Sequence, residues 1–70
     1  MKNSIKVERA KKNITQAELA ALVHVSRQTI NAIELGKYVP STLLSLKIAH
    51  VSGTTVDEIF ELEDDDWGKK

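Results

Sequence analysis

Residues 15–36, TQAELAALVHVSRQTINAIELG, decide the fold of this chain. The first four letters, TQAE, match the capping-box pattern, in which a threonine hydroxyl accepts from an early backbone N–H while a glutamate three residues later reaches back. Leu19, Leu22 and Val23 then repeat at helical spacing. The pattern predicts a helix over residues 16–23 with these three side chains facing inward.

A second helix follows almost at once. Ser26 is a candidate N-cap, Ile30 and Ile33 keep helical spacing, and Gly36 suits the left-handed conformation that often ends a helix. Because only about three residues separate the two helices, the stretch predicts a tight helix-turn-helix. Helices of this length are not stable alone, so both must pack on the rest of the chain.

The segments on either side predict a short helix before the helix-turn-helix and a longer one after it. The short helix covers residues 4–12, with an inner face formed by Ile5, Val7 and Arg9. The longer helix follows Pro40, begins at a Ser41 cap and stops at Gly53. Six apolar residues of the longer helix are expected to supply packing contacts: Leu43, Leu44, Leu46, Ile48, Ala49 and Val51.

The C-terminal part predicts a fifth helix and a short strand. TVDE at residues 55–58 is a second capping box, which opens a helix running through Ile59 and Phe60. Residues 61–63 alternate between polar and apolar, so we interpret them as a short strand. The three aspartates at 64–66 repel one another, and we expect them to stay solvated.

The composition excludes several classes of protein. A chain of 70 residues makes one domain near the lower limit for a single core, and without cysteine it has no disulfide or thiolate metal site to stabilise it. We therefore expect oligomerisation. The apolar runs are too short to span a membrane, and the N-terminus lacks the apolar core of a signal peptide, so we expect a cytoplasmic protein with no membrane partner.

The formal net charge of zero hides an asymmetry. Residues 1–50 contain eight lysines and arginines against three acidic residues, whereas residues 51–70 contain seven acidic residues against Lys69 and Lys70. A basic body with an acidic tail can still attract a polyanion through one face. A solvated surface whose charges happen to be segregated explains the same counts, so charge alone leaves both interpretations open.

The outer face of the predicted third helix carries polar side chains that suit DNA. With Ile30 and Ile33 inward, Arg27 and Gln28 lie on the outer face at the start of the helix. Arginine offers a donor fork to guanine in the major groove, and glutamine can pair bidentately with adenine. Polar residues at an exposed helix start also serve capping and solubility, so the residues alone leave DNA reading and a plain helical interaction module both open.

The chain resembles the Cro/repressor-type (XRE-like) helix-turn-helix family of bacterial, archaeal and phage transcription regulators, in its compact stand-alone form. The segments that carry this resemblance are TQAELAALV, HV, SRQTINAIELGKY and the later proline. The resemblance covers Ile5 to Phe60 and includes LKIAHVSGTTVDEIF. It implies an all-α, five-helix lambda-repressor-like DNA-binding domain, with a short two-stranded sheet formed by the chain ends.

The resemblance also implies roles for individual residues. It gives the reading of DNA bases to Arg27, Gln28, Thr29 and Asn31. It gives phosphate contacts to Gln16, Lys37 and Tyr38. It pairs Arg9 with Glu34, which ties the first helix to the third. It places His24 on the turn, where relatives commonly have glycine, and because histidine is among the few other residues enriched at positive φ, we expect positive φ there.

The implied function is a sequence-specific regulator, a repressor, that binds double-stranded DNA at an inverted repeat as a homodimer. The alternative is a protein-interaction module, antitoxin-like or adaptor, on the same fold. Neither interpretation needs catalysis, a cofactor or a small-molecule ligand. His24 and His50 belong to no metal-site spacing, and no nucleophile–base pair can be argued.

The chain departs from the family pattern in three places. Glu8 stands where family members usually have an apolar residue, and Val7 lies one position earlier as its substitute, so we expect a first helix that is rotated or loosely packed. Ser52 and Thr54 replace larger apolar residues, which predicts a leaner core near the last two helices. Ala32 occupies a position that reads bases in some relatives and cannot do so here through its side chain.

We expect residues 1–62 to form the DNA-binding domain and residues 63–70 an acidic tail. Three apolar residues at and beyond the fifth helix suggest a dimer surface: Phe60, Leu62 and Trp67. The alternative is that Phe60 completes the core of the monomer and Trp67 frays with the tail.

Overall fold

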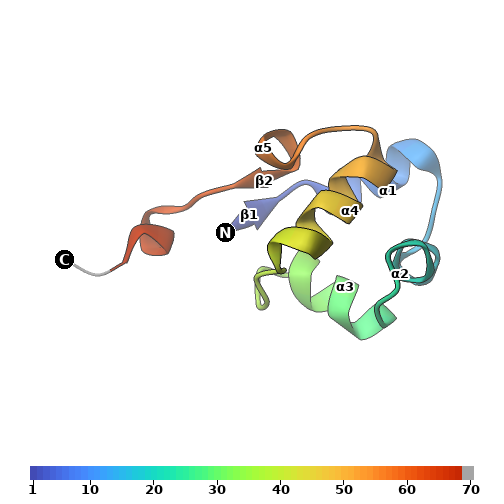
Figure 1. The fold of residues 1–70 in the computed structure, drawn as a ribbon, viewed down its shortest axis with the longest axis horizontal. Helices are drawn as coiled ribbons and strands as arrows, with labels where there is room; N and C mark the ends of the chain where they lie inside the picture. The colour runs from blue at the N-terminus through green and yellow to red at the C-terminus, as the bar shows by residue number, and fades with distance from the viewer. Residues whose placement is uncertain (69–70) are drawn as a thin grey trace.

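The computed structural model describes residues 1–68 and places five α-helices between two short strands (Figure 1). The elements, in order, are β1 (Lys2–Asn3), α1 (Ile5–Lys12), α2 (Gln16–Val23), α3 (Arg27–Glu34), α4 (Thr42–Ser52), α5 (Val56–Ile59), β2 (Phe60–Glu61) and a 3-10 helix, η1 (Asp64–Trp67). The five predicted helices and the lambda-repressor-like fold are confirmed. Lys69 and Lys70, the last residues of the predicted tail, lie outside the described residues.

The helix starts follow from side-chain caps. Thr15, Ser26, Ser41 and Thr55 each accept a hydrogen bond from the backbone N–H three residues later. The two predicted capping boxes, at Thr15 and Thr55, are both complete. Each such cap contributes about 0.5–2 kcal/mol, which matters for helices that cannot stand alone.

The helix ends use residues in the left-handed conformation. His24 has φ 64°, which confirms the positive φ predicted for the turn, and its neighbour Val25 donates to the carbonyl of Ala20 at 3.0 Å. Asn13 ends α1 in the same way with φ 58°, which we did not predict. Gly53 ends α4 and Gly36 follows α3, with φ of 74° and 76°. The helix-turn-helix therefore bends at a histidine, without glycine.

The core lies where α1–α5 converge. Its side chains that expose no more than 1% of their surface are Ile5, Leu19, Val23, Ile30, Ile33, Ile48 and Ile59. Ser52 is also buried, at 8% exposure, so a small polar side chain occupies part of the interior near the end of α4. The core is thus built from one or two large residues per helix.

Four apolar residues that we expected to face inward are exposed. Val7, Leu22, Leu43 and Leu46 expose between 54% and 64% of their surface. Glu8, in contrast, is partly buried, with 18% of its side chain exposed and its carboxylate 3.3 Å from Lys11 Nζ. The expected rotation of α1 toward Val7 is therefore wrong. On these short helices the apolar stripe is wider than the surface that neighbouring helices can cover.

The chain ends meet in a two-stranded antiparallel sheet. Lys2 pairs with Glu61 and Asn3 with Phe60, which confirms the sheet predicted for the chain ends. The second strand begins at residue 60 and not at 61, because Phe60 leaves the helix with φ −117° and ψ 141° and pairs with Asn3. The helix expected to run through Phe60 therefore ends at Ile59.

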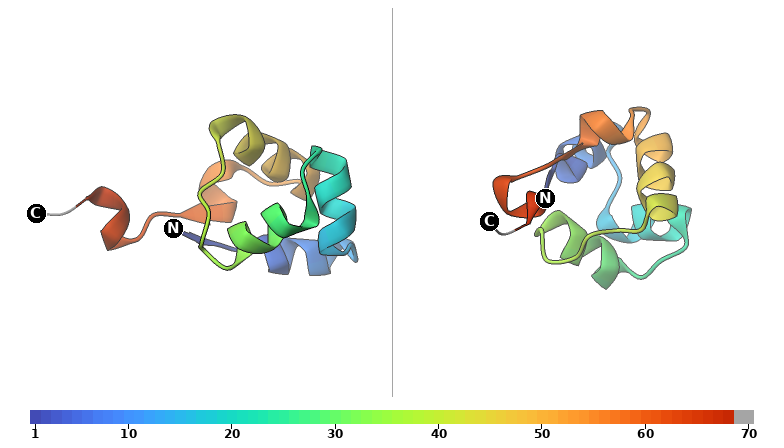
Figure 2. Two further views of the ribbon diagram at one scale, coloured as in Figure 1. Left: turned by 90° about the horizontal axis from the view of Figure 1, so that it is seen from below. Right: turned by 60° about the vertical axis from the view of Figure 1, so that its left-hand side comes forward.

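Residues 62–68, which we call the C-terminal arm, stand away from the helical body (Figures 1 and 2). They account for the elongated shape, with principal extents of 40 × 21 × 19 Å. The aspartates 64–66 are exposed, as expected, but they do more than repel one another, since they begin η1. We did not predict this turn.

A charged contact fixes the arm to the start of the chain. The Met1 ammonium lies 2.9 Å from Glu63 Oε1 and 3.2 Å from Asp66 Oδ2. Hydrogen bonds to Glu63 and Asp66 raise the pKa of this ammonium above its ordinary value. The backbone N–H of Glu63, and then the ammonium, hold the pKa of Asp66 below its ordinary value. Both partners thus stay charged near neutral pH, which stabilises η1.

None of the helices within residues 1–68 has the length and apolarity needed to cross a membrane.

Candidate nucleic-acid interface

The exposed face of α3 brings together the side chains predicted to read bases. Arg27 and Gln28 are exposed at the first two positions of α3, and Thr29 and Asn31 are partly buried beside them. Ile30 and Ile33 fix this orientation because they are buried against the core on the opposite face. The side chains that DNA would meet first are therefore Arg27 and Gln28.

The hydroxyl of Thr29 is already engaged. It lies 2.9 Å from the hydroxyl of Ser26, which also accepts from the backbone N–H of Thr29 at 3.1 Å. The N-cap Ser26 and Thr29 thus form one hydrogen-bonded unit. Because a hydroxyl has one donor and two acceptor positions, Thr29 keeps capacity for further hydrogen bonds.

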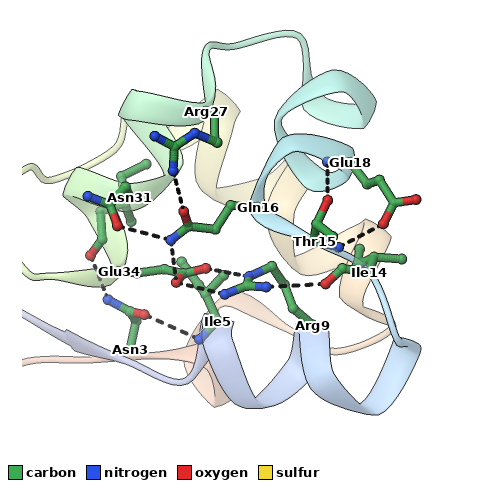
Figure 3. A network of polar contacts seen from close by, with 11 residues as sticks. Asn3, Ile5, Arg9, Ile14, Thr15, Gln16, Glu18, Arg27, Asn31 and Glu34 are labelled. Carbon is green, nitrogen blue, oxygen red and sulfur yellow. Dashed lines mark hydrogen bonds and ion pairs between the residues drawn. The ribbon is translucent and has the colours of Figure 1, made fainter.

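Gln16, at the start of α2, is the centre of a polar network between α2 and α3 (Figure 3). Its amide nitrogen donates to Asn31 Oδ1 and to Glu34 Oε1, each at 3.0 Å. Its amide oxygen accepts from Arg27 Nη1 at 3.0 Å. Gln16 therefore links one end of α3 to the other and holds both Arg27 and Asn31.

The same network reaches α1 through an ion pair. Arg9 donates to both carboxylate oxygens of Glu34, at 2.6 and 3.0 Å, and also to the carbonyl of Ile14 at 3.2 Å. The side chains expose only 14% and 7% of their surfaces. This confirms the predicted pair of Arg9 and Glu34 and ties α1 to α3.

The protonation states of the pair follow from its contacts. Burial alone raises the pKa of Glu34, but hydrogen bonds from Arg9 and Gln16, and the charges of Arg9 and Lys6, outweigh it. The pKa of Glu34 therefore lies below its ordinary value. The hydrogen bond to Glu34 raises the pKa of Arg9 further. The pair stays ionised at neutral pH, so the amide of Gln16 donates to a charged carboxylate there.

Asn3 contributes a contact that sequence reasoning missed. Its amide nitrogen donates to the carbonyl of Ile33 at 2.8 Å, and its oxygen accepts from the backbone N–H of Ile5 at 3.2 Å. It thus connects β1 to α1 and to the end of α3. An asparagine two residues before a helix is a recognisable local signal, but its bond to α3 depends on tertiary packing.

The linker after α3 completes the face. Lys37 and Tyr38 are exposed beyond the end of α3. A hollow of about 300 Å³ is lined by Ser26, Gln28, Thr29, Ala32 and Tyr38. The structure thus brings Tyr38 next to Gln28 and Thr29, with the short side chain of Ala32 among them. Phosphate-binding and base-reading candidates therefore border one surface.

The three residues predicted for a dimer surface divide into two kinds. Phe60 is buried in the core of the monomer, with 7% of its surface exposed. Leu62 and Trp67 expose 56% and 72% of their surfaces.

Within residues 1–68, no group of three or more histidine, aspartate or glutamate side chains is arranged to hold a metal ion.

Comparisons with known proteins agree with this geometry. A family model described as helix-turn-helix matches residues 5–59. An HTH-type transcriptional regulator of Methanocaldococcus jannaschii is 53% identical, over 94% of this chain and 100% of that protein. The regulator YgzD of Bacillus subtilis is 45% identical, over 93% of this chain and 98% of YgzD. A regulator of Archaeoglobus fulgidus is 44% identical, over 99% of this chain and all of that protein. The chain belongs to the Cro/repressor-type helix-turn-helix family.

Proposed function

We propose that this protein is a sequence-specific DNA-binding transcriptional regulator. The observation that supports this most is the exposed pair Arg27 and Gln28 at the start of α3, backed by the Gln16 network. The names of the relatives, all HTH-type transcriptional regulators, support the same assignment. The protein acts by binding alone, with no catalytic step. It works in the cytoplasm, where the DNA is.

In this proposal α3 enters the major groove with its N-terminal end first. Arg27 donates its fork to guanine O6 and N7, and Gln28 pairs with adenine or bonds a neighbouring base edge. Thr29 and Asn31 flank these contacts. Each base contact of this kind favours binding to the correct base over a wrong base by about 1–3 kcal/mol of binding free energy.

Phosphate contacts position the same face on the duplex. Gln16 reaches one phosphate by giving up one of its two amide donor bonds, to Asn31 or to Glu34, with support from the first-turn N–H groups of α2. Lys37 and Tyr38 reach the backbone beyond α3. These contacts carry no sequence information and make the affinity depend on salt. The acidic arm, which stands away from the body, is kept off the DNA.

The regulator acts as a homodimer on an inverted repeat. A two-fold axis in the protein matches a two-fold axis in the DNA, and two α3 helices then enter successive major grooves about 34 Å apart. A dimer also gives this small fold additional burial. Occupation of an operator excludes other proteins from the same stretch of DNA, which makes repression the expected outcome.

Selection of bound duplexes from a random pool tests the proposal. We expect an enriched inverted repeat whose half-sites lie about ten base pairs apart, centre to centre. Fluorescence anisotropy at several salt concentrations should then show tighter binding to the selected duplex than to a scrambled one. Arg27→Ala should lose this preference, whereas Lys11→Ala, on the exposed side of α1, should keep it. Absence of duplex binding at low salt would overturn the proposal.

The alternative, a protein-interaction module on the same fold, is favoured by the exposed Leu62 and Trp67 on the arm. It predicts a co-purifying partner and no salt-dependent affinity for duplex DNA. The anisotropy titration therefore separates the two functions directly.

A further inference from the structure

Two hollows on the body adjoin one another, and we call them together the α4–α5 groove. The first has a volume of about 260 Å³ and is lined mostly by apolar side chains, among them Val39, Leu46 and Phe60. The second has a volume of about 410 Å³ and shares Leu46 and Val56 with the first. Leu46 exposes 56% of its surface between them. Exposed apolar grooves on small domains mark contact surfaces.

The C-terminal arm carries apolar side chains that its own chain leaves uncovered. Leu62 and Trp67 expose 56% and 72% of their surfaces, and neither lines the α4–α5 groove. The ion pairs of the Met1 ammonium with Glu63 and Asp66 hold the arm in its projecting position. The arm therefore projects from the helical body (Figure 2).

The groove has a cation on its α4 side and an acid on its α5 side, because Lys47 follows Leu46 on α4 and Asp57 lines the second hollow. Leu43, Leu46, Lys47 and His50 recur at helical spacing along α4, so the exposed leucines share a stripe with a lysine and a histidine. On the arm, Glu63, Asp64 and Asp65 are exposed between Leu62 and Trp67. The α4 side of the groove thus presents apolar side chains beside a lysine, and the arm presents apolar side chains beside acidic ones.

We propose that the arm of one chain lies in the α4–α5 groove of a second copy, and that the second arm lies in the first groove. Trp67 and Leu62 cover Leu46, and the acidic residues of the arm lie beside Lys47 and His50. Such a contact is isologous and closes at two copies. The inference rests on the homodimer proposed above and names the residues that build it.

The size of the contact suits a stable dimer. Specific interfaces bury about 800 Å² on each partner, and an aromatic side chain alone buries about 150–250 Å². Trp67 would therefore supply about a fifth to a third of the area buried on one partner, and Leu62 and Leu46 add to it. Aromatic anchors seated in pockets are also the residues that dominate binding energy.

Trp67 is the only tryptophan of the sequence, so its fluorescence reports on the arm alone. In a dilution series of the full chain without DNA, we expect a blue-shifted emission at high concentration that moves to the red on dilution. Sedimentation should show dimer and monomer over the same range. A blue shift that does not depend on concentration would place Trp67 on its own chain and overturn the inference.

Two variants test the two sides of the contact. Leu46→Glu alters the groove and Trp67→Ala the arm, and each should raise the dissociation constant of the dimer by ~30-fold or more. Leu22→Glu is the matched control, because Leu22 is also a helical leucine with 56% exposure but lies on α2, away from the groove. It should leave the dimer unchanged. Circular dichroism should show the folded helical spectrum for all three, since the altered side chains are exposed.

A mixture of the two variants makes the test specific to exchanged arms. The Leu46→Glu chain keeps its arm and the Trp67→Ala chain keeps its groove, so the mixed dimer retains one complete contact that neither variant has by itself. Mixing should therefore restore dimers and a blue-shifted emission. A dimer whose Trp67 stays in solvent would overturn the inference while leaving the proposed function intact, whereas loss of specific DNA binding by the natural chain would overturn the proposed function.

Discussion

Arg27 donates a hydrogen bond to Gln16 at 3.0 Å, so the side chain assigned to base reading is held by the one assigned to phosphate binding. The two residues begin α3 and α2, respectively. Gln16 in turn donates to Asn31 and Glu34, and Glu34 is fixed by Arg9. Arg27 is thus oriented in the free protein by a chain of bonds that ends on α1, which would reduce the entropy lost in the proposed contact with a base.

This coupling changes what we expect from a substitution of Gln16. If Gln16 contacted only phosphate, Gln16→Ala would weaken binding to every sequence alike. Because Gln16 also holds Arg27, we expect a further loss at the base that Arg27 reads. In a double-mutant cycle of DNA binding with Arg27→Ala, the coupling energy should be about 0.5–3 kcal/mol. Coupling within error of zero would show that the two side chains act independently on DNA.

Arg27 and Lys37 should give opposite signatures in DNA binding. Arg27→Ala should cost about 1–3 kcal/mol and relax the preference at one base position. Lys37→Ala should weaken binding to all sequences about equally and lower the slope of log affinity against log salt by about 1. Anisotropy titrations against the selected operator and its single-base variants measure both. Reversal of the two patterns would mean that the roles are exchanged.

The ion pair of Arg9 and Glu34 should make stability depend on pH. The folded-state pKa of Glu34 lies below its ordinary value of 4.5, so its contribution is complete above that pH and is lost as pH falls through the folded-state pKa. Glu34→Gln should destabilise the protein by about 1–3 kcal/mol at neutral pH. Below pH 4.5 the difference between the two proteins should narrow. Urea unfolding at several pH values measures this.

Glu61→Gln serves as the control for that experiment. Glu61 lies 3.9 Å from Lys2 Nζ, and both side chains are well exposed. A surface pair of this kind contributes about 0–1 kcal/mol, so the substitution should change stability little at any pH. If the difference in the free energy of unfolding between the natural chain and Glu34→Gln stayed constant down to acid pH, the role given to Glu34 would be contradicted.

The turn at His24 predicts an unusual response to glycine. Left-handed φ costs a non-glycine residue about 1–2 kcal/mol, and glycine loses about 0.5–1 kcal/mol through its greater freedom in the unfolded chain. His24→Gly should therefore leave stability unchanged or raise it by up to about 1 kcal/mol. Ala21→Gly, at an exposed position within α2, should lower stability by about 1 kcal/mol. Thermal unfolding compares the two, and a clear loss for His24→Gly would point to a contact of the imidazole.

Local features of the sequence predicted most of the backbone. The caps at Thr15, Ser26, Ser41 and Thr55 depend on residues within one turn of each other, and all were predicted correctly. The positive φ of His24 was predicted from the family resemblance and is confirmed. Burial was harder to predict. An exposed Leu22 and a buried Leu19 have the same chemistry, and only the placement of the neighbouring helices separates them.

Long-range contacts explain what the sequence could not predict. The strand register depends on Asn3 meeting Phe60, and the order of η1 depends on Met1 reaching Asp66, 65 positions away. Of the candidate DNA face, the exposed positions of Arg27 and Gln28 followed from helical periodicity. That Gln16 spends its hydrogen bonds on Arg27, Asn31 and Glu34 follows only from the packing of α2 against α3. The roles of these residues on DNA stay predictions.

The pairing of β1 with β2 has a consequence for how the molecule opens. Each strand is two residues long, and the pairing joins the two ends of the chain. Contacts between distant positions are entropically costly to close, so this sheet is expected to form after the helices and to open before them. Amide exchange should be faster at the sheet and arm than in α2 and α3. A chain whose ends have opened would still present its recognition helix, as a monomer.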